Sequence, residues 1–146
     1  MKKLIFLMVA MAFMSCEKEP KNYVTFSGKI TGPNSDSIQI KKGDYRKVIH
    51  VNEDGTFSDT LKVEPSSYTL YDGGEYAYLF LKNGFDINMT LDTKAFDETI
   101  QFTLEGANHS NFLAEKIRME MELLDLYVFI RLDSVDLYKV LAELKY

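Results

Sequence analysis

Residues 75–91 read EYAYLFLKNGFDINMTL, and they predict two β-strands joined by a turn. In the second half Phe85, Ile87, Met89 and Leu91 alternate strictly with polar residues. This period of two is typical of a strand that buries one face. The Asn-Gly pair at 83–84 separates the two apolar runs, because glycine readily adopts turn conformations. The stretch therefore predicts β structure with one face in a core.

Similar short segments lie on both sides of this stretch and are separated by turn signals. Asp54-Gly55 and Gly73-Gly74 are pairs that favour tight hairpins. The expected strands cover residues 23–30, 37–41, 45–51, 56–63, 68–72, 75–81, 85–91 and 99–105. Their spacing of about ten residues predicts a mainly β fold, an antiparallel β-sandwich of about eight strands.

The period changes after Gly106. Apolar residues recur at three- and four-residue steps, so the C-terminal part is expected to be helical; they are Leu113, Ile117, Met121, Leu124 and Val128. Polar residues at 108–111 are candidates for its N-cap. Asp133-Ser134 is a second point at which a helix could begin, so we expect one or two amphipathic helices.

This helical segment becomes apolar on nearly all sides between residues 123 and 132. A helix that is apolar all round is normally covered by other structure. We therefore expect a contact surface for a protein partner or for self-association. Its candidate residues are Leu123, Leu124, Val128, Phe129 and Leu132.

The N-terminus reads MKKLIFLMVAMAFMSC and has the features of a lipoprotein signal peptide over residues 1–15. Lys2 and Lys3 precede an apolar run of 11 residues, which is too short to span a membrane and suits an export signal. Ser15-Cys16 resembles the end of a lipobox, so Cys16 is predicted to carry the lipid. Polar residues 16–22 then form a tether. The expected location is the cell envelope, at the outer membrane of a Gram-negative bacterium, facing the periplasm or the surface.

Composition agrees with a domain at 23–106 followed by a helical segment at 107–146 and excludes several functions. The 146 residues carry a net charge of −5, which disfavours nucleic acid as a partner. Cys16 is the only cysteine, so the chain has no disulfide, no CxxC redox pair and no cysteine-rich zinc site.

No group of residues predicts catalysis, a metal or a cofactor. His50 and His109 lack ligands at metal-binding spacing. The acidic turn at 52–55 lacks the later glutamate of a calcium loop, and a plain turn is the better interpretation. Glu115, Glu120 and Glu122 have the spacing of a solvated helix face. The sequence therefore predicts a non-enzymatic protein.

Two further patterns concern carbohydrate, one as a possible ligand and the other as a covalent modification. Aromatic side chains are dense at Tyr68, Tyr71, Tyr76, Tyr78, Phe80 and Phe85. They could pack across strands or, on an exposed face, stack on a glycan. Separately, Ser37, Thr60 and Ser134 each follow an aspartate and precede an apolar residue, a pattern of some bacterial O-glycosylation systems. They are candidate modification sites.

Residues 23–112 resemble the N-terminal β-domain of lipid-anchored TlpA/ResA-like thiol-disulfide interchange proteins. The matching features are Gly28-Lys29-Ile30-Thr31-Gly32, Asp54-Gly55-Thr56-Phe57, Pro65 ahead of Tyr68-Thr69-Leu70, and Leu104-Glu105-Gly106 ahead of Asn111-Phe112. In that family a thioredoxin domain with a CxxC motif follows. This chain has no CxxC, so the resemblance implies an accessory module without the enzyme. The alternatives are the front part of a truncated or split thiol-disulfide oxidoreductase and a surface glycan-binding lipoprotein.

Overall fold

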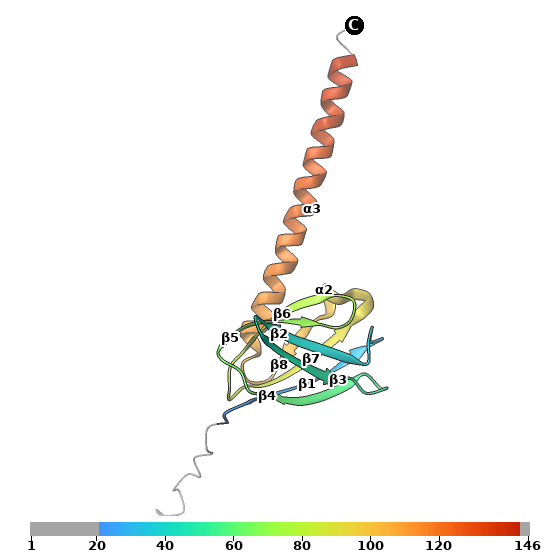
Figure 1. Ribbon diagram of the computed structural model, residues 1–146. Helices are drawn as coiled ribbons and strands as arrows, with labels where there is room; N and C mark the ends of the chain where they lie inside the picture. The colour runs from blue at the N-terminus through green and yellow to red at the C-terminus, as the bar shows by residue number, and fades with distance from the viewer. Residues whose placement is uncertain (1–20, 144–146) are drawn as a thin grey trace, which may run out of the picture.

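The computed structural model describes residues 21–143, and their side chains as far as Arg131. Eight strands form two four-stranded sheets that pack face to face (Figure 1). One sheet has the order β4-β1-β7-β8, and its strands are Thr56–Leu61, Val24–Thr31, Asp86–Asp92 and Gln101–Thr103. The other has the order β3-β2-β5-β6, with strands Tyr45–His50, Ser37–Lys42, Ser66–Tyr71 and Tyr76–Leu81. The predicted β-sandwich of about eight strands is confirmed. One pair, β1 with β7, is parallel and not antiparallel.

The core lies between the sheets and follows the alternation seen in the sequence. Ile87, Met89 and Leu91 of β7 are buried, while the residues between them are not. Leu70 and Leu79 are fully buried in the other sheet. The buried side chains of both sheets form one cluster, which is what stabilises two stacked sheets.

The connection at residues 51–55 is a turn, but the predicted hairpin there is wrong. β3 and β4 belong to different sheets, so the chain crosses between the sheets at this point. Asp54 accepts hydrogen bonds from the Thr56 backbone N–H at 3.0 Å and from its Oγ1 at 2.6 Å. Gly55 has φ +81°, and an added Cβ would lie 2.0 Å from the carbonyl oxygen of Ile30. Local sequence therefore specifies the turn, and core packing decides which strands pair.

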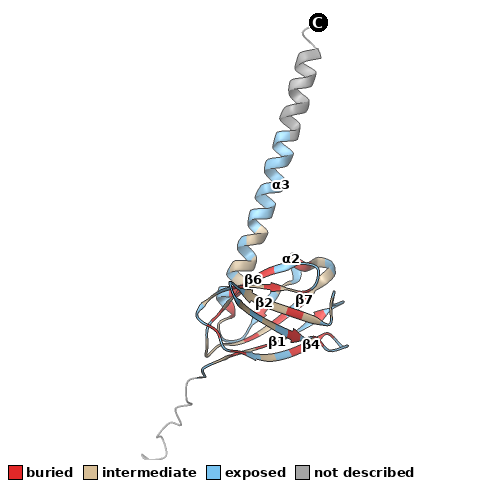
Figure 2. Ribbon diagram, viewed as in Figure 1, coloured by how far each residue is buried: buried red, intermediate tan, exposed pale blue. Residues whose placement is uncertain are grey.

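After the short helices η1 (Thr93–Ala95) and α2 (Phe96–Thr99), the chain ends in one long helix, α3 (Ala107–Glu143). Its 37 residues span about 56 Å, and it continues without a break through Asp133-Ser134, so the second helix considered from the sequence is not formed. Figure 2 shows half-buried residues near its base and exposed residues beyond it. Within residues 21–143, no helix combines the length and the hydropathy of a transmembrane segment.

The start of α3 packs against β6 and β8, which are edge strands of the two sheets. The buried Ser110 hydroxyl accepts a hydrogen bond from the Phe80 N–H of β6 at 3.0 Å. The Asn111 side chain accepts from the Phe102 N–H of β8 and donates to its carbonyl, both at 2.8 Å. These residues were predicted as helix caps, but they pair with the unsatisfied edges of β6 and β8. The reason is that an edge strand presents free backbone groups.

Candidate functional site

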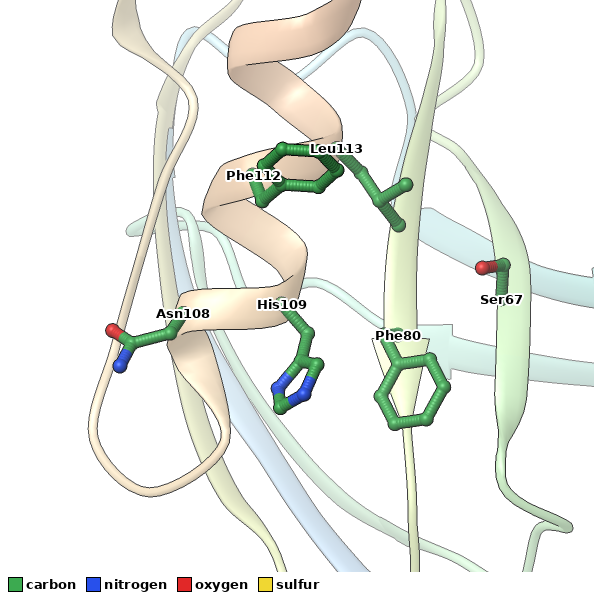
Figure 3. Close-up of a pocket in the computed structure, with 6 residues that line it drawn as sticks. All are labelled: Ser67, Phe80, Asn108, His109, Phe112 and Leu113. Atoms are coloured by element: carbon green, nitrogen blue, oxygen red, sulfur yellow. The ribbon is translucent and has the colours of Figure 1, made fainter.

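A groove runs between the first turns of α3 and the outer face of β5 and β6 (Figure 3). It consists of two adjoining cavities of about 270 Å³ and 300 Å³, which share Ser67 and Leu113. The remaining lining residues are Phe80, Asn108, His109, Phe112, Tyr78, Lys116 and Ile117. The walls are mainly rings and aliphatic side chains, so the groove suits an apolar or ring-shaped group.

His109 stands at one end of this groove as a packing ring. Its imidazole stacks on Phe80, with ring centroids 5.0 Å apart, and on Phe85 at 6.2 Å. Across residues 21–131, no three His, Cys, Asp or Glu side chains lie close enough together to hold a metal ion. His50 is exposed on β3 and lies far along the chain from this cluster. His109 therefore supplies flat surface to the groove.

The helix carboxylates take part in exposed ion pairs. Glu120 pairs with Lys116 at 2.8 Å between Oε1 and Nζ, and Glu115 pairs with Arg118. These pairs join neighbouring turns of one helix and are half-exposed. Glu115 and Arg118 also line a cavity of about 450 Å³ together with Asp97 and Glu98, so the Glu115 carboxylate is held by its ion pair within that cavity.

The predicted partner surface lies on the free part of α3. Leu123 is 66% exposed, Phe129 61% and Val128 47%, and Leu124 is also exposed. Leu132 lies beyond the residues whose side chains are described. Met119, Met121, Leu126, Tyr127 and Ile130 add to the surface and are exposed on the same stretch. We call residues 119–131 the apolar helix segment. In Figure 1 this part of α3 extends beyond the sandwich, and its large apolar side chains are exposed.

The dense aromatic stretch divides between core and surface. Tyr68 is buried, donates a hydrogen bond from its hydroxyl to the Glu64 carbonyl at 3.0 Å, and packs edge-on against Tyr45. Burial raises the pKa of Tyr68 above its ordinary value. Tyr76 and Tyr78 are exposed on the outer face of β6, and Tyr76 stacks on Tyr71 with centroids 4.5 Å apart. The stretch therefore contains both core residues and an open aromatic surface, which the sequence alone could not separate.

The modification sites lie apart from one another. Ser37 is half-buried at the start of β2, and Thr60 is exposed on β4. Ser134 is beyond the described side chains, and Cys16 lies outside the described residues. The glycosylation and lipidation of these residues stay predictions.

Comparison with known proteins identifies no family. No protein-family model matches the chain, and no curated protein does either. Among solved structures, the crystal structure of a DUF3823 family protein from Parabacteroides merdae ATCC 43184 is similar, with 16% identity and a TM-score of 0.35. The similar region covers 57% of this chain and 47% of that chain, so this chain matches less than half of it. A similarity at this level supports no inference about function.

Proposed function

We propose that this protein is a membrane-anchored, non-catalytic module of the bacterial cell envelope that binds a protein partner through the apolar helix segment. The observation that carries the proposal is the exposure of about half or more of each large apolar side chain from residues 119 to 130. Soluble monomers rarely leave such a continuous apolar surface in water. A covering partner accounts for it.

The proposed anchor favours a protein over the membrane as that partner. The five peptide units from Cys16 to Lys21 span at most about 18 Å, so lipid on Cys16 holds the sandwich near the membrane. The apolar helix segment begins 12 residues after Ala107, about 18 Å along α3. In Figure 1 the helix extends away from the end of the sandwich where the described chain begins. The segment is thus presented away from the anchored end.

The resemblance to thiol-disulfide interchange lipoproteins suggests the class of partner. In those proteins a thioredoxin-like domain follows the helix. We therefore propose that a redox domain on a separate chain packs on the apolar helix segment. Such a contact fits an accessory module that binds a redox partner, and it also fits the front part of an oxidoreductase that is split into two chains.

Photo-crosslinking in cells tests the partner. A photoreactive residue at position 124 should give a discrete crosslinked species, identified by mass spectrometry as a protein with a CxxC motif. The same residue at Lys82, which is exposed on the loop after β6, is the matched control. Crosslinks of equal yield at both positions, or only to lipid at 124, would contradict the proposal. Loss of membrane association in Cys16→Ser tests the anchor separately.

A further inference from the structure

The outer face of the β3-β2-β5-β6 sheet carries a regular array of basic and aromatic side chains. The strand registers place two neighbouring rows across the sheet, Val48–Gln39–Tyr71–Tyr76 and Arg46–Lys41–Thr69–Tyr78. We call these eight residues the outer-face array. Four strands at about 4.8 Å spacing make it about 14 Å wide. The basic groups lie on β2 and β3, and the rings lie on β5 and β6.

The aromatic half of the array is a platform with open ring surface. Tyr71 and Tyr76 stack with an interplanar angle of 26°, and the Tyr71 hydroxyl donates to the Gly73 carbonyl at 2.8 Å, which holds that ring in place. Tyr76 and Tyr78 are 58% and 47% exposed. Tyr78 also lines the cavity of about 300 Å³ beside α3, so the platform continues into a concave wall.

The basic half is ordered and contains no acidic residue. The Arg46 guanidinium donates to Gln39 Oε1 at 2.9 Å, which leaves its other N–H groups available. The Lys41 ammonium lies 5.4 Å from the centroid of the Tyr71 ring. None of the eight positions is occupied by Asp or Glu, although the chain as a whole carries a net charge of −5. The array is therefore a local cationic surface on an acidic protein.

We propose that the outer-face array binds an acidic polysaccharide, that is, a carbohydrate that carries carboxylates. Sugar rings present an apolar face to aromatic rings, and Tyr76 and Tyr78 supply that surface. The Arg46 guanidinium pairs with a carboxylate of the sugar, and Lys41 adds a second positive charge. Thr69 and Gln39 offer hydrogen bonds to its hydroxyl groups. The net negative charge of the protein disfavours unspecific attraction of a polyanion, so the attraction must come from this surface. The site is independent of the contact proposed for α3.

Affinity gel electrophoresis tests the proposal with polygalacturonate as the probe and its fully methyl-esterified form as the uncharged control. The full chain, held in non-ionic detergent at 0.15 M salt, should be retarded by the acid polymer and about tenfold less by the ester. Arg46→Gln and Lys41→Gln should weaken binding to the acid polymer only. Tyr76→Ala with Tyr78→Ala should weaken binding to both polymers.

Lys82→Gln and Tyr23→Ala are the matched controls, because one removes an exposed cation and the other a partly exposed ring, both outside the array and outside α3. They should leave retardation unchanged, and circular dichroism should show that all variants keep the β fold. Three results would overturn the proposal: no retardation by the acid polymer, equal retardation by the ester, or equal weakening in the control variants. A failed crosslink on α3 would leave these results unaffected, so the two proposals can fail separately.

Discussion

Ser110 and Asn111 join the helix to both sheets, although they are neighbours in the sequence. One side chain satisfies the edge of β6 at Phe80, and the other satisfies the edge of β8 at Phe102. In an antiparallel sandwich the edge strands are where backbone groups lack partners. The two side chains thus supply hydrogen bonds that a neighbouring strand would otherwise make. These polar contacts position the first turn of α3.

Replacing Asn111 with Ala should destabilise the protein by about 1–3 kcal/mol, because the N–H and C=O of the buried Phe102 lose their partners. Urea unfolding measures the change. Asn108→Ala is the control, since Asn108 is exposed one turn away, and it should cost little. Equal losses in both variants would show that the edge contact is not the cause.

Gly106→Ala tests the turn before α3. Gly106 has φ +91°, and an added Cβ would lie 2.2 Å from the Phe85 ring, so we expect a loss of about 1–3 kcal/mol. Gly43 also has a positive φ of 51°, but a Cβ added there would meet nothing within 4 Å. Gly43→Ala should therefore lose less, and thermal unfolding of the two variants separates the clash from the backbone strain. A larger loss at Gly43 would contradict this account.

The contribution of Asp54 to the stability of the folded protein should depend on pH. Its hydrogen bonds from the Thr56 side chain and backbone lower its pKa below the ordinary value. A lowered folded-state pKa means that the stabilisation is complete above the unfolded pKa of about 3.9 and is lost as pH falls through the folded pKa. Asp54→Asn should thus lower the melting temperature at pH 7, and the difference should shrink below about pH 4. A difference in melting temperature that stays constant from pH 7 to pH 3 would contradict this account.

At the scale of elements, α3 behaves as two parts. Its first turns pack on β6 and β8 through Ser110 and Asn111, whereas the large apolar side chains of the apolar helix segment are exposed. Helices gain most of their stability from packing, so the two parts depend on different surroundings. The first part belongs to the sandwich, while the second depends on what covers it.

Glutamate substitutions should distinguish these parts. Val128→Glu should change the free energy of unfolding by no more than about 0.5 kcal/mol, because Val128 is exposed, but it should lower binding of a hydrophobic dye. Ile117→Glu places a charge in the half-buried groove and should destabilise the fold. Unfolding by Val128→Glu would mean that the segment is already covered within the folded chain.

For the whole molecule, the structure predicts a gradient of local stability. The shared core extends through both sheets, whereas it includes none of residues 119–130, whose large apolar side chains are exposed. Backbone amides of residues 119–131 should exchange hydrogen faster than those of residues 110–117, because opening them breaks no core contact. Hydrogen-exchange mass spectrometry measures this. Addition of the partner captured at position 124 should slow exchange in the outer stretch, and unchanged exchange would speak against that contact.

Several features could be predicted from the chain alone because they depend on neighbours in sequence. Alternation at Ile87, Met89 and Leu91 predicted a strand, and the three- and four-residue steps after Gly106 predicted a helix. The acidic turn was predicted as a turn, but its strands join different sheets. Ser110 and Asn111 were predicted as caps because their edge partners lie 30 and 9 residues away. Serine and asparagine side chains can either cap a helix or hydrogen-bond to the backbone of another segment. Which of the two occurs depends on the surrounding tertiary structure.

The sequence by itself determined the β-sandwich class, the helical character of the C-terminal part and its apolar stretch, since periodicity and composition are local properties. That this part is one unbroken helix through Asp133-Ser134 was seen only in the structure. The tertiary structure alone decided the parallel pairing of β1 with β7 and the division of the aromatic residues between core and surface. It also aligned Arg46 and Lys41 with Tyr76 and Tyr78 across four strands. The physical reason is that register and sheet order depend on contacts between distant segments, which the whole core must satisfy together.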